Sequence, residues 1–276
     1  MPRVRLDDRA IVSISGKDAE DLLQGLITTD LDALAPDEAR PGALLTPQGK
    51  ILFEFLISRD GDGLRLETAS DQAEALLKRM TMYKLRSAVE LSIRASDAVT
   101  VIFDEAAPTG AYRDHRFEKA GVALFRAYGE ATGDTAGAED LERLRIAAGI
   151  ANAGADYAVQ DAFPHDVLLD KNGGLSFKKG CYVGQEVVIR ILHRGQGRVA
   201  RRLVWVESAS HAADTPPWQA GEVVHAGDKA VGAVTSACWS PARGGLLGIA
   251  MVHRDAAEPG TSVTIGSHVA TVQKLP

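Results

Sequence analysis

The sequence predicts an α+β fold followed by a separate all-β domain. Through residues 1–195, strand-like and helix-like segments mix without the steady alternation of a parallel α/β protein, which favours antiparallel sheets. After Val199 the helical periodicity disappears, and short β-rich runs are separated by Gly, Pro and Asp turns, a pattern typical of a small β-barrel. Residues 193–198 (HRGQGR) mark the joint, so we expect domains at 1–195 and 196–276.

Local patterns place the elements of the first domain. The segment 18–24 (DAEDLLQ) carries its acids early, where the dipole of a helix favours them. The RDGDG run at 59–63 is a hairpin turn, and Ser70 is the expected N-cap of a helix that reaches Met80. The expected elements are, in order, a strand at 10–15, a helix at 18–24, strands at 51–57 and 64–67, a helix from 70 to 80, strands at 89–93, 99–103 and 122–127, and a helix at 138–148.

Length and composition limit the class of protein. The chain has 276 residues, 45% hydrophobic and 25% charged, which is ordinary for a globular protein of two or three domains. Cys181 and Cys238 are too few for a disulfide framework or for a four-thiolate zinc or iron–sulfur site within one chain. The N-terminus lacks an apolar signal-peptide core, and no stretch reaches the roughly 18 apolar residues of a membrane span. We therefore expect a cytoplasmic protein in a reducing compartment, with no membrane partner.

Charge is distributed unevenly along the chain. The net charge of −6 argues against a general nucleic-acid binder. The segment from Lys178 to Arg202 has the opposite charge, because it contains seven lysines and arginines and a single acid, Glu186. A basic segment in an acidic protein is a candidate site for an anion, and a solvated strand and loop surface is the alternative.

Cys181 lies inside this basic segment, in the run KKGCYVGQEVVIR. Nearby cations favour the thiolate of a cysteine, which raises its reactivity towards electrophiles, oxidants and metals. Gly180 and Gly184 allow a tight turn beside a ligand. Gln185 can donate to and accept from the edge of a heterocycle, and Glu186 can accept from its amino groups. The alternative is a buried structural cysteine ahead of a helix that starts at Gly184.

Other motifs are absent or weak. The seven histidines show no HExxH or comparable metal-ligand spacing, and the chain has no GxxxxGK[ST] phosphate loop. We interpret the acids of the proline-bounded loop at 161–166 as helix caps. No metal site is expected, and these residues by themselves do not identify a reaction.

Five stretches give the chain a resemblance to a known family. They are VSISGKDAEDLLQGLITTDL, ALLTPQGKILFEF, LRIAAGI, FPHDVLLDKNGGLSFKKGCYVGQEVVIR and VGAVTSACWSPARGGLLGIAMV. Through them the chain resembles, over nearly its whole length, the folate-binding YgfZ family within the glycine-cleavage T-protein-like (GcvT-like) superfamily. The KGCYVGQE run is the most specific of these motifs.

The resemblance implies an architecture and a role. The architecture is two ferredoxin-like α+β units, pseudo-symmetric around a central hole, plus a C-terminal small β-barrel. Tetrahydrofolate or a one-carbon derivative is then expected in the hole. The implied role is iron–sulfur cluster assembly or repair, and through it tRNA thiomodification, with iron–sulfur enzymes or assembly proteins as partners. The family needs the motif cysteine.

Site residues follow by matching motif positions. Arg145 matches the superfamily arginine that helps to hold the ligand, and its guanidinium suits bidentate pairing with a folate carboxylate. A surface helix arginine is the alternative. The implied reacting residues are Cys181 and Lys179. The implied folate-binding residues are Arg145, Tyr182, Gln185, Glu186 and Glu54, and the supporting motif residues are Gly180, Gly184, Arg190, His193 and Arg194.

One departure separates two enzymatic interpretations. Where T-proteins carry an Asp-Asp pair that serves aminomethyl transfer, this chain has Phe53-Glu54. Phe53 can neither accept nor donate a proton. The Glu54 side chain is one carbon longer than that of aspartate, and it can face the other side of a strand. T-proteins also lack the motif cysteine, so the YgfZ interpretation is favoured. The alternatives are a one-carbon transferase that uses Glu54 and an RNA binder that uses residues 178–202, which few aromatic residues support.

Overall fold

A computed structural model describes residues 2–94, 97–103, 106–118, 120–129, 135–194, 200–208 and 215–274, without the side chains of 193 and 194. The chain divides into two compact units. Unit 1 comprises Met1–Gly137 and Leu169–Val187, and unit 2 comprises Ala138–Leu168 and Val188–Pro276. The two units therefore interleave along the sequence.

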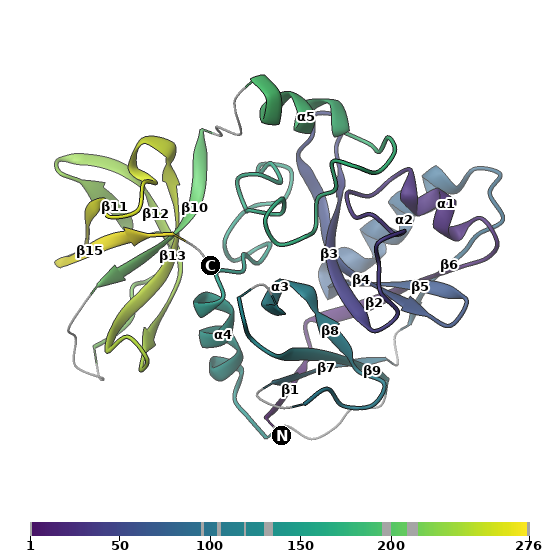
Figure 1. The fold of residues 1–276 in the computed structure, drawn as a ribbon, viewed down its shortest axis with the longest axis horizontal. Coiled ribbons are helices and arrows are strands. Elements are labelled where there is room, and N and C mark those ends of the chain that lie inside the picture. Colours follow the sequence, from purple (N-terminus) through teal and green to yellow (C-terminus); the bar gives the residue numbers. More distant parts are fainter. Residues whose placement is uncertain are drawn as a thin grey trace. The chain divides into compact units, whose positions relative to one another are not determined.

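Unit 1 is built on a sheet of nine strands among the described residues (Figure 1). The strands are β1 Arg3–Leu6, β2 Arg9–Ser15, β3 Glu38–Leu45, β4 Ile51–Asp60, β5 Gly63–Ala69, β6 Glu90–Arg94, β7 Ala98–Phe103, β8 Tyr112–Asp114 and β9 Leu124–Gly129. Their order across the sheet is β1-β7-β9-β8-β3-β4-β5-β2-β6. The short pairing of β3 with β8 is parallel, and it joins two antiparallel halves.

Within the described part of unit 1, three α-helices lie wholly inside the unit: α1 Ala19–Gln24, α2 Ala73–Lys84 and α3 His115–Glu118. Leu76 and Met80 of α2 lie in the apolar core with residues of β2 and β5. The expected N-cap at Ser70 is wrong. Ser70 begins a 3-10 turn, Ser70–Gln72, and Gln72 stands at the N-cap position of α2 without a side-chain hydrogen bond.

The opposite face of β5 carries charge instead of apolar side chains. Glu67 is fully buried and accepts hydrogen bonds from Arg126 of β9 over 2.6 Å and from Tyr128 over 3.0 Å. Arg9 of β2 donates to the same carboxylate over 3.0 Å. Burial would raise the pKa of Glu67, but the guanidinium groups of Arg126 and Arg9 outweigh burial and lower it. A charged layer therefore links the two halves of the sheet.

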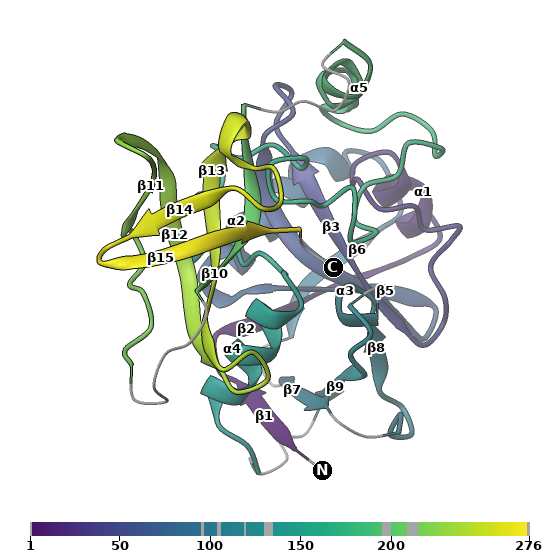
Figure 2. The ribbon, with the colours of Figure 1, turned by 60° about the vertical axis from the view of Figure 1, so that its left-hand side comes forward.

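Unit 2 contains α4 Ala138–Ala147, most of α5 Gln185–Arg194, and a closed barrel. The barrel strands are β10 Arg201–Ser208, β11 Val223–Ala226, β12 Lys229–Ser240, β13 Gly245–His253, β14 Ser262–Ile265 and β15 His268–Gln273, with a 3-10 turn at Arg254–Ala256. Their order around the barrel is β10-β13-β12-β11-β14-β15. Helix α4 contacts β12 and β13 (Figure 2). The core is mostly valine, as expected for β-branched residues on a pleated surface.

The predicted fold class is confirmed, because the chain is a mixed α+β protein with a C-terminal barrel. Strands β1, β3 and β8 and the short helix α3 were not expected from their local patterns, whereas the helix start considered at Gly184 is that of α5. Strand β3 contains Pro41 and Gly42, which are turn signals in an isolated sequence. It is nevertheless a strand because it pairs along its length with β4 and, by its first residues, with β8.

Candidate functional site: the Cys181 loop

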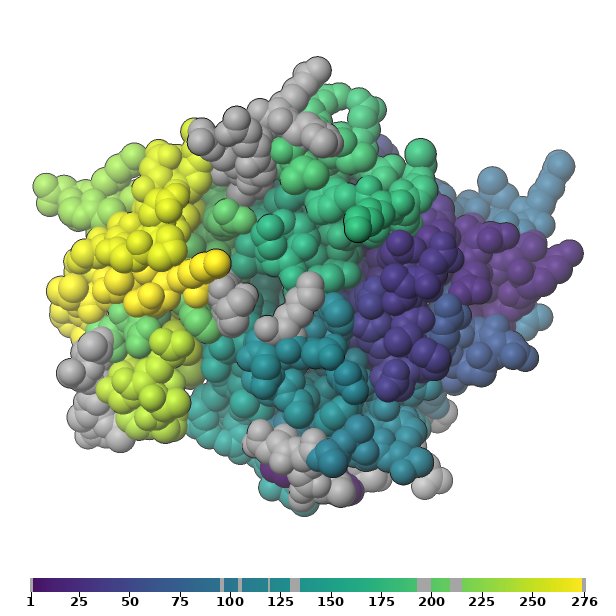
Figure 3. All heavy atoms as spheres, viewed as in Figure 1, coloured from purple at the N-terminus to yellow at the C-terminus, as the bar shows by residue number. Residues whose placement is uncertain are grey.

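The Cys181 loop, residues 174–184, belongs to unit 1 and is held at its start by Thr28. The Thr28 hydroxyl donates to the Gly174 carbonyl over 2.6 Å, and the Ser176 amide donates to the Thr28 carbonyl over 2.9 Å. On its other side Gly174 packs closely against Leu169, whose Cδ1 would lie 2.4 Å from a Cβ at this position. Figure 3 shows the segment that carries the loop (green) at the surface of unit 1, beside N-terminal residues (purple).

Lys179 fixes the middle of the loop. Its side chain is buried, and Nζ donates to the carbonyls of Ile27 over 2.8 Å and Thr29 over 2.6 Å. Burial lowers the pKa of Lys179 to about 8, against the raising effect of Asp30 and Asp32. The Lys179 ammonium therefore forms hydrogen bonds with two backbone carbonyls. This position favours a structural task for Lys179 rather than the reacting one implied by the resemblance.

Cys181 is exposed, whereas the residue after it is buried. Tyr182 is 6% exposed, its hydroxyl donates to the Ser176 carbonyl over 3.5 Å, and burial raises its pKa. The Lys179 ammonium lies 5.6 Å from the Tyr182 ring centroid, within cation–π range. The alternative of a buried structural cysteine is therefore wrong: two buried neighbours anchor the loop and leave the thiol in solvent.

Gly184 ends the loop and starts α5. Its φ is +79°, and a Cβ there would lie 2.5 Å from the Thr46 carbonyl oxygen, so the β3–β4 turn packs directly on this glycine. Gly49 of that turn also has a positive φ, +78°, and approaches Val187. The Gln185 side-chain amide donates back to the Gly180 carbonyl over 3.4 Å. The helix start considered at Gly184 is thus present.

Two further motif residues, Glu186 and Arg190, are exposed on α5. The side chains of His193 and Arg194 lie outside the described residues. The loop therefore brings Lys179, Cys181, Tyr182 and Gln185 together, and the assigned ligand contacts of these residues stay predictions.

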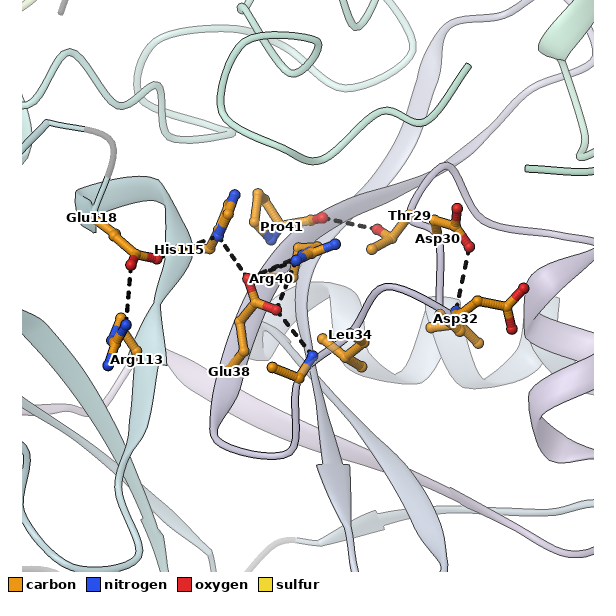
Figure 4. A network of polar contacts seen from close by, with 12 residues as sticks. Thr29, Asp30, Asp32, Leu34, Glu38, Arg40, Pro41, Arg113, His115 and Glu118 are labelled. Atoms are coloured by element: carbon orange, nitrogen blue, oxygen red, sulfur yellow. Dashed lines mark hydrogen bonds and ion pairs between the residues drawn. The ribbon is translucent and has the colours of Figure 1, made fainter. Parts of the chain in front are cut away.

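A polar network behind the loop was not expected from the sequence (Figure 4). Glu38 of β3 lies 2.6 Å from His115 Nδ1, and it accepts hydrogen bonds from Arg40 at both oxygens and from the Ala35 amide over 3.1 Å. Burial would raise the pKa of Glu38, but these hydrogen bonds lower it to about 2. The His115 ring lies against Gly173, where a Cβ would be 2.5 Å from it. No local motif marks Glu38 and His115, because they are 77 residues apart in the sequence.

Phe53 and Glu54 face opposite sides of β4. Phe53 is 6% exposed and belongs to the apolar core. Glu54 is half-buried on the charged side, near Arg116. Burial would lower the pKa of Arg116, but Asp114 and, more weakly, Glu54 raise it. Glu54 is therefore a carboxylate on the charged side of the sheet, beside the Arg116 guanidinium.

Arg145 of α4 belongs to unit 2, and internal acceptors occupy its five N–H donors. Its Nε and Nη2 pair with both Glu142 oxygens over 2.8 and 2.6 Å, and Nη2 also donates to Ser236 Oγ over 2.7 Å. Nη1 donates to the Ile150 carbonyl over 2.6 Å and to Asp156. Arg145 is 8% exposed, so the alternative of a surface arginine is wrong. Among its side-chain partners, Asp156 is fully buried, and Glu142 is half-exposed at 47%.

The described residues contain no group of three His, Cys, Asp or Glu side chains placed to hold a metal ion. Within the same parts of the chain, no helix has both the length and the apolar character needed to cross a membrane.

The chain is similar to several known proteins. Residues 201–276 match the family model of the glycine cleavage T-protein C-terminal barrel domain. The iron–sulfur cluster assembly factor IBA57 homolog, mitochondrial, of Pyricularia oryzae is 31% identical over 217 residues, covering 69% of this chain and 54% of the relative. The tRNA-modifying protein YgfZ of Escherichia fergusonii is 29% identical over 238 residues, covering 74% of this chain and 71% of the relative.

A solved structure extends the likeness to the whole fold. The crystal structure of glycine cleavage system aminomethyltransferase T from Bartonella henselae superposes with a TM-score of 0.80 at 17% identity, covering 100% of this chain and 85% of that chain. The chain spans about half the length of the fungal relatives, at 54% and 53%. Taken with the motif loop and the barrel, these likenesses show that the chain belongs to the YgfZ/IBA57 family of GcvT-like proteins.

Proposed function

We propose that this chain is an assembly factor for iron–sulfur proteins that binds a tetrahydrofolate derivative and acts through the Cys181 thiol. Relatives named for cluster assembly and for tRNA modification support the role. The observation that carries the proposal is the exposure of Cys181 on a loop whose neighbours Lys179 and Tyr182 are buried. Such a loop presents a thiol to a partner at low cost in conformational entropy.

The thiol contributes one ligand. Iron–sulfur clusters are commonly coordinated by four thiolates, so a cluster coordinated by Cys181 takes its other ligands from the partner protein. The partners are iron–sulfur enzymes or assembly proteins, and any effect on tRNA modification passes through them, without direct nucleic-acid binding. The cytoplasmic location stays a prediction, and the fungal relatives are named mitochondrial.

The test of the thiol is a pair of cysteine variants. In cells that lack the endogenous homologue, Cys181→Ala is expected to lose the ability to restore the activity of a cluster enzyme. Cys238→Ala, which removes the buried cysteine of β12, is the matched control and is expected to retain that ability. Equal restoration by both variants would refute the thiol role.

Folate binding at Arg145 requires a change of partner. The Glu142 carboxylate forms the bidentate pair that a ligand carboxylate would form, so we propose that a folate carboxylate takes the place of Glu142. Calorimetric titration of tetrahydrofolate into the reduced, anaerobic protein tests this. Glu142→Ala is expected to bind more tightly than wild type, because the competitor is gone. Arg145→Lys is expected to bind more weakly, because lysine cannot form the bidentate pair.

The calorimetric outcome separates the two halves of the proposal. No heat with wild type or with Glu142→Ala would refute folate binding at this arginine, and it would leave the cysteine test unaffected. Arg145→Ala is a poorer probe, because it leaves the fully buried Asp156 without its guanidinium partner and is expected to destabilise unit 2.

A further inference from the structure

We propose that the C-terminal end of α2 is a docking surface for an acidic segment of a partner protein that carries aliphatic side chains. The docking surface consists of Lys78, Met82, Leu85 and Arg86. It lies in unit 1, and the inference depends neither on folate nor on Cys181.

The first observation is apolar exposure on the outer face of the helix. Met82, in the last turn of α2, is 62% exposed, and Leu85, at the C-cap position three residues later, is 87% exposed. Lys78 precedes Met82 by one helical turn on that face. The inner face is already complete, because Leu76 and Met80 are fully buried there. A surface pocket lined by Asp18, Leu85, Arg86 and Ser87 adjoins the exposed leucine.

The second observation is the backbone of Leu85. Its φ is 45° and its ψ is −105°, a conformation in which a side chain is strained and glycine is not. With 87% of its surface exposed, the leucine gains little from contacts within the chain. Stability alone would favour glycine at this position. A leucine that adds strain and remains in solvent is instead explained by a contact outside the chain.

The third observation is local charge. Residues 75–89 contain four basic residues and no acid, in a chain whose net charge is −6. The Asp18 carboxylate faces the same pocket, but it accepts a hydrogen bond from the Ala88 amide over 2.6 Å. Along the sequence, Glu74 and Glu90 are the nearest acids on either side of this basic run. The surplus of positive charge selects an acidic partner, and the exposed leucine and methionine select aliphatic side chains on it.

The experiment uses the full chain and a defined probe, a fluorescein-labelled DEDLLDED peptide, with DEDSSDED as the comparison. Fluorescence anisotropy is expected to show that the leucine peptide binds at least about 10-fold more tightly than the serine peptide, as befits an apolar anchor. Leu85→Gly is expected to weaken binding of the leucine peptide about 10-fold, while its thermal unfolding midpoint equals or exceeds that of wild type. Arg86→Glu is expected to weaken binding of the leucine peptide and to make that binding less sensitive to salt concentration.

Two controls define the specificity. Val269→Ser removes another exposed apolar residue, 67% exposed on β15 of the barrel, and is expected to leave peptide binding unchanged. Cys181→Ala is also expected to bind the peptide like wild type, so a failure of the docking proposal is distinct from a failure of the proposed function.

Several results would overturn the proposal. Peptide binding that Leu85→Gly and Arg86→Glu do not change places the contact elsewhere. A lower unfolding midpoint in Leu85→Gly shows that the leucine serves the fold of the chain. Binding to phosphatidylserine vesicles in place of the peptide identifies a membrane surface. Self-association in sedimentation that Leu85→Gly abolishes identifies a second copy of the chain as the occupant.

Discussion

Replacing Lys179 with methionine removes an ammonium that two buried carbonyls share. The carbonyls of Ile27 and Thr29 lose donors at 2.8 and 2.6 Å. Each lost bond to a charged donor costs about 1.5–3 kcal/mol. Methionine carries no charge, so it avoids the free-energy penalty of burying the lysine ammonium. The fall in the pKa of Lys179 from 10.5 to about 8 corresponds to a penalty of about 3 kcal/mol. We expect a net loss of about 1–2 kcal/mol in the free energy of unfolding near neutral pH.

The loss should grow as the pH rises. The unfolded chain keeps the Lys179 proton up to its pKa of 10.5, whereas the folded chain releases it from about 8. Between these values the unfolded state binds more protons, so wild-type stability rises with pH. The rise from about pH 7 to about pH 10 amounts to about 2–3 kcal/mol. Methionine carries no such proton, so the difference between the two proteins should reach about 4 kcal/mol at the higher pH.

Urea unfolding of both proteins at a series of pH values measures this difference. Circular dichroism is the suitable signal, because all three tryptophans, Trp205, Trp218 and Trp239, lie in unit 2 and report on the other half of the chain. The exposed neighbour Lys178 supplies the matched control, Lys178→Met. A difference that stays constant or shrinks between neutral and alkaline pH would refute the buried, carbonyl-bound lysine.

Three further substitutions test the supports of the site. Gly184→Ala should lower the free energy of unfolding by about 2 kcal/mol or more, because φ is positive and the Thr46 carbonyl oxygen would lie 2.5 Å from the added Cβ. The control is Gly180→Ala, which has open space around it and should stay within about 0.5 kcal/mol of wild type. Equal unfolding midpoints for the two variants would contradict the packing described. Glu38 has its pKa lowered from 4.5 to about 2, so its contribution of about 3 kcal/mol is present above about pH 5 and lost as the pH falls towards 2. Wild type and Glu38→Gln should therefore converge in stability at acid pH, and curves that stay parallel in acid titrations would count against the network. Glu67→Gln removes one of the two carboxylates that pair with the buried Arg126 and leaves Asp114 as the other, so it should cost about 1.5–3 kcal/mol in chemical unfolding. A loss below about 1 kcal/mol would show that the charged layer does not hold the sheet halves together.

The sequence by itself determined the features that depend on neighbours along the chain. Short β-rich runs between Gly, Pro and Asp turns predicted the barrel, because each hairpin is encoded locally. The helix at 138–148 was predicted from its period and is α4, Ala138–Ala147. The KGCYVGQE run marked the loop and the helix start at Gly184. It did not reveal that Lys179 and Cys181, two residues apart, lie in opposite environments, because burial is set by what packs on the loop.

Only the tertiary structure decided which contacts those residues make. The carbonyls that hold Lys179 come from residues 27 and 29, some 150 residues earlier in the chain. The acceptors that occupy Arg145 include Asp156 and Ser236, and the partners of Glu67 come from a different strand hairpin. Such contacts leave no periodic or spacing signal in the sequence. A buried lysine or arginine and an exposed one can stand in the same sequence pattern, and only the folded structure distinguishes them. Burial gives Lys179 and Arg145 partners inside the chain, whereas the Cys181 thiol is exposed; the ligand roles of all three stay predictions.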